Sequence, residues 1–261
     1  MANRKPVILV TNDDGYLSQG LLTLAEAAAT LGEVFVVSPQ QAMSGMSHAI
    51  TASRPLRVHR HPMDRVENFY VCNGTPVDCI KLGLHKIMPV RPDMILSGIN
   101  YGSNAAASTH YSGTVAAARE GALHGIASIA FSSLNTDISD TLDYCSGIVK
   151  QIITEILKNP PAKGCLLNVN IPNLPQSQIK GIRICRLAQG FWKETFDTRK
   201  DPAGRDYNWL EGKFINAEPS SPETDETALY DGYVAVVPLK VDSTDYESIT
   251  SLRTYDFAVN H

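Results

Sequence analysis

The chain has 261 residues, of which 43% are hydrophobic and 19% are charged, and its formal net charge is −4. This size and composition fit one large α/β domain, or one domain with an appendage. The nearly neutral charge argues against a nucleic-acid duplex or an anionic membrane as partner, and no apolar stretch approaches the ~20 residues of a membrane span.

The first half of the chain alternates patterns typical of buried strands and of helices. A continuous apolar run predicts a strand at Val7–Thr11, and a helical pattern over residues 21–31 separates it from a second strand at residues 34–37. The next predicted elements are a short strand pair at 57–59 and 69–71, a helix that starts at Thr75-Pro76, strands at 94–97, 126–132 and 166–171, and helices at 112–123 and 148–157. This alternation predicts an α/β fold with a mostly parallel sheet and helices on both faces.

The pattern changes at about Pro172, where proline, glycine and charged residues become frequent. Two strands are predicted at 182–186 and 233–239, without a long helix between them. The stretch 190–221 carries both tryptophans, Trp192 and Trp209, and we expect it to be irregular. We therefore expect residues 1–171 to form the catalytic region and residues 172–261 an extension used in association.

Two features predict the compartment. The five cysteines are odd in number and lack C-x-x-C spacing, which indicates reduced thiols. The apolar run that follows the amino terminus has only four residues, too few for the core of a signal peptide. We expect a soluble cytoplasmic protein.

Three polar clusters follow predicted parallel strands. They are residues 12–15 (Asn-Asp-Asp-Gly), residues 43–48 (Met-Ser-Gly-Met-Ser-His) and residues 97–104 (Ser-Gly-Ile-Asn-Tyr-Gly-Ser-Asn). Ligands of an open parallel sheet bind beyond the carboxyl ends of its strands, so all three clusters are expected at one edge. Two carboxylates, a hydroxyl and an amide oxygen suit a hard cation such as Mg²⁺ or Mn²⁺ better than zinc. The adjacent acids Asp13 and Asp14 would then be neutralised by that cation.

A helix start follows the third cluster, at Ser112-Gly113-Thr114. Free backbone N–H groups and the helix dipole favour an anion there. A phosphate at this position, next to a cation on the aspartates, has the geometry of phosphoryl transfer.

Each signal has an ordinary structural explanation when taken alone. Asp13 could cap a helix, Asp14 and Ser44 could be loop residues, and Asn100 could belong to a turn. Two other functional classes carry similar residues: haloacid-dehalogenase phosphatases, which need Asp-x-Asp after the first strand, and receiver-like switches, which need an aspartate near the position of Asn100. A dinucleotide oxidoreductase is disfavoured because no G-x-G-x-x-G follows the first strand. The three clusters together favour a metal-dependent site.

The chain resembles the SurE family, the stationary-phase survival protein E nucleotidases. The motifs that carry the resemblance are "TNDDG" at 11–15, "SGMSHAIT" at 44–51, "NGTPVDC" at 73–79, "SGINYGSN" at 97–104, "YSGTVAAA" at 111–118 and "TDETALYDGYVAVVPL" at 224–239. Ala106 and Ser108 depart from the glycine and aspartate often found there, which leaves the nucleotide preference open.

The resemblance implies a Rossmann-like fold with a carboxy-terminal extension that exchanges between subunits of a homo-oligomer, a dimer or a tetramer. It implies a 5′-nucleotidase, an acid-phosphatase-like hydrolase that acts on nucleoside 5′- and 3′-monophosphates and, in some members, on short polyphosphate. One Mg²⁺ or Mn²⁺ per subunit is the implied cofactor. Carried over by position, the metal ligands are Asp13, Asp14, Ser44 and Asn100, the catalytic residues are Asp13, Asp14 and Asn104, the phosphate-binding residues are Asn104, Ser112, Gly113 and Thr114, and the supporting residues are Asn12, Gly15 and Gly45.

Overall fold

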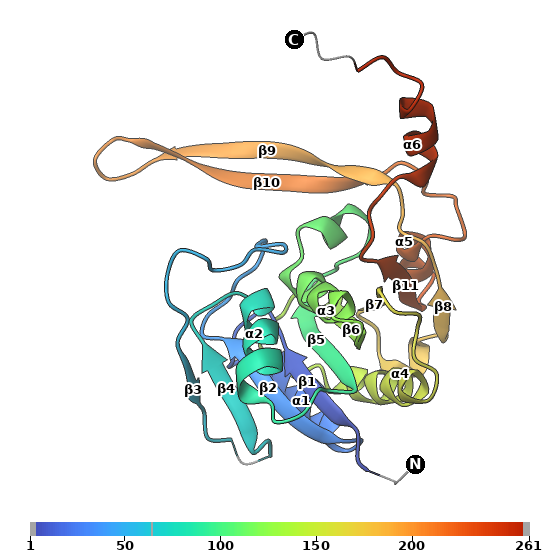
Figure 1. Cartoon of the computed structure of the whole chain (residues 1–261). Coiled ribbons are helices and arrows are strands. Elements are labelled where there is room, and N and C mark those ends of the chain that lie inside the picture. Colours follow the sequence, from blue (N-terminus) through green and yellow to red (C-terminus); the bar gives the residue numbers. More distant parts are fainter. Residues whose placement is uncertain (1–3, 64, 258–261) are drawn as a thin grey trace.

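The computed structural model describes residues 4–63 and 65–257 (Figure 1). Within these residues, nine strands form one sheet in the order β3-β4-β2-β1-β5-β6-β7-β11-β8. The bounds are β1 Val7–Thr11, β2 Glu33–Pro39, β3 Val58–Arg60, β4 Asn68–Cys72, β5 Met94–Tyr101, β6 Ala127–Ser133, β7 Cys165–Ile171, β8 Ile182–Ile184 and β11 Val234–Lys240. Among the neighbouring pairs, only β3 with β4 and β7 with β11 are antiparallel. The predicted mostly parallel α/β sheet is confirmed.

Helices cover both faces of this sheet. The principal helices are α1 Gln19–Ala29, α2 Pro76–Leu82, α3 Gly113–Leu123 and α4 Ser146–Lys158. Helices α1 and α4 contribute Leu21, Leu24 and Ile153 to one apolar core, whereas α2 and α3 contribute Ile80 and Ala117 to another. All five residues of β1 are buried, because apolar side chains from both cores pack against it.

The carboxyl ends of β1, β2 and β5 lie together at one edge of the sheet. Strand β1 pairs in parallel with β2 on one side and with β5 on the other, and Thr11 is opposite Ser97. The segments that follow these strands therefore leave the sheet side by side. This arrangement brings the three polar clusters of the sequence to a common edge.

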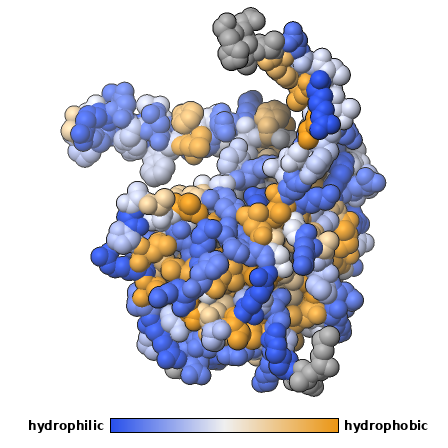
Figure 2. Space-filling model, viewed as in Figure 1, coloured by the Kyte–Doolittle hydropathy of each residue, from blue (hydrophilic) through white to orange (hydrophobic). Residues whose placement is uncertain are grey.

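The prediction of irregular structure over residues 190–221 is wrong. Strands β9 Gly190–Lys200 and β10 Asp206–Asn216 form a long antiparallel hairpin that extends well beyond the body of the molecule (Figure 1). Most of its residues are exposed, and apolar and hydrophilic residues are mixed along it (Figure 2). A hairpin with no buried face has no apolar alternation to reveal it in the sequence. The expected arm is therefore a regular element.

The remaining elements are short. They comprise α5 Asp225–Tyr230, α6 Tyr246–Leu252, the π-helical turn η1 Gly83–Ile87, and the 3₁₀ turns η2 Ala106–His110, η3 Asp143–Cys145 and η4 Gln176–Gln178. Strands β8 and β11, from the second half of the chain, complete one end of the main sheet. Across the described residues, none of the helices combines the length and apolar character that crossing a membrane requires.

Candidate active site

The chain leaves β1 through a tight turn that carries Asp13 and Asp14. The buried Asn12 side chain holds this turn, since its Nδ2 donates to the Gly15 carbonyl at 2.8 Å and its Oδ1 accepts from Ser38 Oγ at 2.6 Å. Gly15 has a φ of 91°, and a Cβ at this position would lie 3.1 Å from the Gln41 backbone. Asn12 and Gly15 thus shape the turn without facing a ligand themselves.

Helix α3 begins against the Asp13 carboxylate. The Thr114 backbone N–H donates to Asp13 Oδ2 at 3.2 Å, and the Thr114 hydroxyl donates to Asp13 Oδ1. A Cβ on Gly113 would lie 3.0 Å from Asp13 Oδ2, so glycine permits this close approach. The anion at this helix start is therefore Asp13 itself, and Thr114 orients that carboxylate.

The two neighbouring aspartates are both difficult to ionise in this environment. Burial raises the pKa of Asp13, although its hydrogen bonds from Thr114 oppose the shift. Burial and the adjacent Asp13 charge raise the pKa of Asp14 to about 7, and the Tyr101 backbone N–H at 3.4 Å offsets this only in part. Two adjacent carboxylates with raised pKa values repel each other when both are ionised. A cation bound between them would stabilise the ionised forms and lower both pKa values.

The loop after β2 brings Ser44 to the same place. The Met43 backbone N–H donates to the Asp13 carbonyl at 2.7 Å, which fastens this loop to the turn after β1. Gly45, with a φ of 74°, directs the chain away immediately after Ser44. Ser44 is exposed and lines the pocket described below.

Asn100 and Asn104 follow strand β5. Asn100 Nδ2 donates to the Gly102 carbonyl at 2.8 Å, which leaves Oδ1 as its available ligand atom. Asn104 is held more tightly: its backbone N–H donates to Asn170 Oδ1 at 2.8 Å, and its Nδ2 donates to Ser132 Oγ at 2.8 Å. An amide nitrogen carries two hydrogens, so Asn104 keeps one N–H for a ligand.

These groups open into a pocket of about 410 Å³. Its walls are formed by Asp13, Ser44, Gly45, Asn100, Tyr101, Asn104, Ser108, Tyr111, Ser112, Trp192, Glu194, Leu210, Glu211 and Gly212. Of the predicted site residues, Asp13, Ser44, Gly45, Asn100, Asn104 and Ser112 belong to this lining. Asn12, Asp14, Gly15, Gly113 and Thr114 lie outside it, next to its members.

The sequence reasoning missed part of the pocket wall. Trp192, Glu194 and Leu210 come from the hairpin, 78 to 96 residues after Thr114, the last predicted site residue. Tyr111 is the first residue of the motif "YSGTVAAA". Because it directly precedes Ser112, a predicted phosphate-binding residue, the sequence could have indicated that Tyr111 lies at the site. The side chains of Asn168 and Asn170 form hydrogen bonds with the Asn104 backbone. These two asparagines are polar residues inside an otherwise apolar strand, and this pattern could have drawn attention to them.

The donor set fits a hard divalent cation. Among the described residues that line the pocket there is no Lys, Arg or His, whereas Asp13, Glu194 and Glu211 are acidic. No three His, Cys, Asp or Glu side chains of the described chain gather as a metal cluster, so a cation here would also need neutral oxygen ligands such as Ser44 and Asn100. Carboxylate, hydroxyl and amide oxygens are the ligands that Mg²⁺ and Mn²⁺ prefer.

The chain is similar to known proteins over nearly its whole length. The family model "Survival protein SurE" matches residues 8–194. A protein of Flavobacterium johnsoniae named 5′-nucleotidase SurE is 43% identical over 256 residues, which cover 98% of this chain and 98% of that one. A protein of Cytophaga hutchinsonii with the same name is 46% identical over 250 residues, 95% of this chain and 96% of that one.

A solved structure agrees with these matches. The SurE protein from Aquifex aeolicus superposes with a TM-score of 0.82 and 37% sequence identity, over 95% of this chain and 98% of that chain. The relatives are named as nucleotidases, which are hydrolases, and neither the dehalogenase nor the receiver class is among these matches. The matching family model, the identities over nearly full length and the shared fold establish that this chain belongs to the SurE family.

Proposed function

We propose that this chain is a metal-dependent phosphomonoesterase that hydrolyses nucleoside 5′- and 3′-monophosphates to nucleoside and phosphate. The observation that carries the proposal is a pocket lined by the buried Asp13 carboxylate, with the partly buried Asp14 directly beside it, and without any cationic side chain among the described residues of its lining. A phosphate group is anionic, so it requires a positive charge that this pocket does not itself supply. The names of the relatives support the same substrate class.

The proposed cation site consists of Asp13, Asp14, Ser44 and Asn100, with one Mg²⁺ or Mn²⁺ per subunit. When bound, such a cation supplies Lewis acidity toward a phosphoryl oxygen. Asp13 is pre-oriented by the Thr114 hydroxyl, and Asn100 is pre-oriented by its hydrogen bond to the Gly102 carbonyl. The side chains are thus held in place before a ligand arrives.

The proposed phosphate contacts come from Asn104 and Ser112. Asn104 lines the pocket and has one amide N–H left for a phosphate oxygen, and Ser112 Oγ, which accepts from the Val115 N–H at 3.1 Å, keeps its own hydrogen for donation. Gly113 and Thr114 contribute indirectly, because they hold Asp13 at the start of α3. These donors stabilise negative charge on the transferred group.

Further proposals concern assembly and location. The carboxy-terminal extension, residues 172–261, is proposed to exchange between subunits of a dimer or tetramer. Tyr246, Leu252, Tyr255 and Phe257 are large and exposed at its end, which supports a docking role on another copy. All five cysteines are free thiols, which supports the cytoplasm as the compartment.

A substrate panel tests the proposed reaction. Phosphate release from 5′- and 3′-monophosphates and from short polyphosphate is measured with Mg²⁺, with Mn²⁺ and with chelator. We expect release from the monophosphates that chelator abolishes, and a loss of at least 10²-fold in Asp13→Asn and Asp14→Asn. Asp143→Asn, an exposed aspartate on η3, is the matched control. Full activity with chelator, or in either site variant, would refute the proposal.

A further inference from the structure

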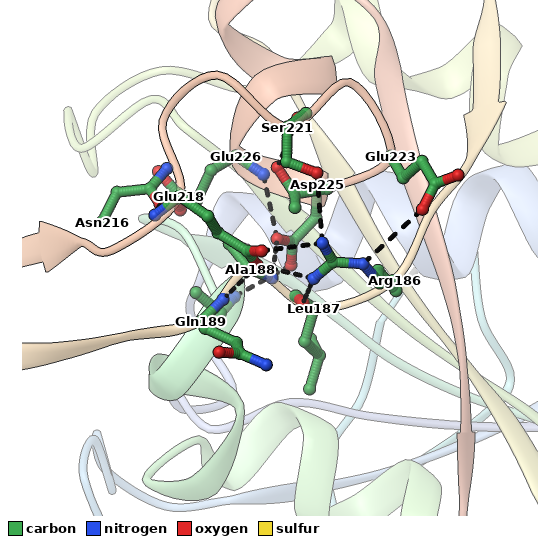
Figure 3. A network of polar contacts seen from close by, with 12 residues as sticks. Arg186, Leu187, Ala188, Gln189, Asn216, Glu218, Ser221, Glu223, Asp225 and Glu226 are labelled. Atoms are coloured by element: carbon green, nitrogen blue, oxygen red, sulfur yellow. Dashed lines mark hydrogen bonds and ion pairs between the residues drawn. The ribbon is translucent and has the colours of Figure 1, made fainter.

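The hairpin is fixed at its root to the segment that borders the pocket. The buried Asp225 carboxylate accepts the Ala106 N–H at 2.9 Å through Oδ2 and the Ala188 N–H at 2.8 Å through Oδ1. Figure 3 shows the neighbouring network, in which Glu218 accepts from Arg186 at 2.5 Å and from the Gln189 N–H at 2.8 Å. One carboxylate thus joins η2 to the start of β9. The hairpin therefore has a defined position relative to the site.

One face of the hairpin contributes to the pocket wall. In the antiparallel register Trp192 is opposite Phe214, Glu194 is opposite Gly212, and Phe196 is opposite Leu210. Directly opposed residues project to the same side of a hairpin. Of this face, Trp192, Glu194, Gly212 and Leu210 line the pocket. Gly212 has no side chain, and the Trp192 ring lies close to it, since a Cβ at this position would be 3.3 Å from Trp192 Cε3.

The pocket has two chemically different ends. At the sheet edge, Asp13, Asn100 and Asn104 present oxygen and amide groups. Toward the hairpin, Trp192, Tyr111 and Leu210 present aromatic and aliphatic surface, and they are 37%, 57% and 65% exposed. A phosphate uses only the first end. The second end is suited to a flat apolar group carried by the same ligand.

Size and charge narrow the choice of that group. Pockets for small organic ligands measure about 300–1,000 Å³. The volume of about 410 Å³ therefore admits a nucleoside in addition to a phosphate. Glu194, on the pocket face of the hairpin, would repel further phosphates at the hairpin end, whereas it can accept hydrogen bonds from amino and hydroxyl groups.

We propose that the hairpin face around Trp192 is the base-binding wall of the substrate pocket, with the nucleobase stacked on the Trp192 ring and Tyr111 at the opposite side. Glu194 accepts from an amino or hydroxyl donor of the nucleoside. This inference rests on the proposed nucleotidase function. It assigns the discrimination between nucleotides and simpler phosphomonoesters to a segment far from the cation ligands in sequence.

The proposed base-binding wall is tested with two phosphomonoesters, one with a nucleobase and one without. The ratio of kcat/KM for adenosine 5′-monophosphate to that for ribose 5-phosphate is measured in the wild type and in Trp192→Ala. We expect this ratio to fall about tenfold, the size of one base–aromatic stacking interaction. Trp192→Phe keeps an aromatic ring and restores most of the ratio.

Trp209→Ala is the matched control. Trp209 has the same side chain on the same hairpin, is 59% exposed, pairs with Asp197 on the other face and is absent from the pocket lining. The ratio stays within twofold of the wild type in this variant. An unchanged ratio in Trp192→Ala, or an equal fall in Trp209→Ala, overturns the proposal.

Fluorescence separates this proposal from the proposed reaction. The chain has two tryptophans, so Trp209→Phe leaves Trp192 as the only tryptophan, and Trp192→Phe leaves Trp209. Adenosine, which carries no phosphate, is expected to quench the first protein saturably and the second one not at all. Equal quenching in both overturns the base-binding wall. Failure of the wild type to hydrolyse either phosphomonoester would refute the proposed phosphomonoesterase function. The adenosine titration would still decide whether the hairpin face binds a nucleobase.

Discussion

Glu120 on helix α3 is a buried carboxylate that holds three basic side chains. Lys81 Nζ lies 2.5 Å from Oε1, His48 Nε2 lies 2.9 Å from Oε2, and His124 Nε2 lies 3.2 Å from Oε1, while the Glu120 side chain is only 4% exposed. The hydrogen bond from His48 and that from Lys81 lower the pKa of Glu120 to about 2. Because His48 belongs to the loop that carries Ser44, this cluster fastens the loop to α3.

Glu120→Gln should therefore destabilise the folded chain. Glutamine has nearly the same shape as glutamate, so the loss comes from removal of the negative charge. The pKa falls from 4.5 to about 2, and each pKa unit corresponds to ~1.4 kcal/mol, so the upper limit of the loss in unfolding free energy at pH 7 is ~3 kcal/mol. Lys81 is 41% exposed, so water screens part of this interaction, and we expect a loss of ~2 kcal/mol. The measurement is the free energy of unfolding in urea at a fixed protein concentration.

The pH dependence has a definite sign. The pKa of Glu120 is lower in the folded chain than in the unfolded one. Its contribution to stability is therefore fully present above about pH 4.5 and is lost as the pH falls toward about 2. The difference between the wild type and Glu120→Gln should fall by about half between pH 5 and pH 3. Glu67→Gln, on an 88% exposed side chain, is the control with little effect. A difference below ~0.5 kcal/mol at pH 7, or one independent of pH, would refute the reasoning.

Two other predictions follow from the site and from the carboxy terminus. Gly113→Ala places a Cβ 3.0 Å from Asp13 Oδ2 and should displace that carboxylate. The rate of phosphate release should therefore fall about tenfold, while the circular dichroism spectrum stays that of the wild type. Unchanged kinetics would contradict a role for this close approach. Removal of residues 242–261 deletes α6 and the exposed Tyr255 and Phe257, so light scattering should show a smaller assembly than that of the full chain. An identical mass for both would contradict subunit exchange.

The sequence by itself determined the mostly parallel sheet and the common edge at which the three polar clusters lie. Continuous apolar runs such as Val7–Thr11 occur where a strand is buried on both faces, and the structure confirms this strand at the same residues. Because parallel strands end at one edge, the chain order of the three polar clusters was enough to predict that Asp13 and Asn100 would meet. The capped start of α2 after Thr75 was predictable for a local reason, since one side chain satisfies nearby backbone groups.

Only the tertiary structure decided the outer wall of the pocket and the supports of its side chains. The hairpin escaped the sequence patterns because neither of its faces is buried, and its position depends on the contacts of Asp225 with both Ala106 and Ala188. Thr114 meets Asp13 across 101 positions of the chain. Local periodicity reports which face of an element is buried, whereas such contacts depend on how separate elements pack together.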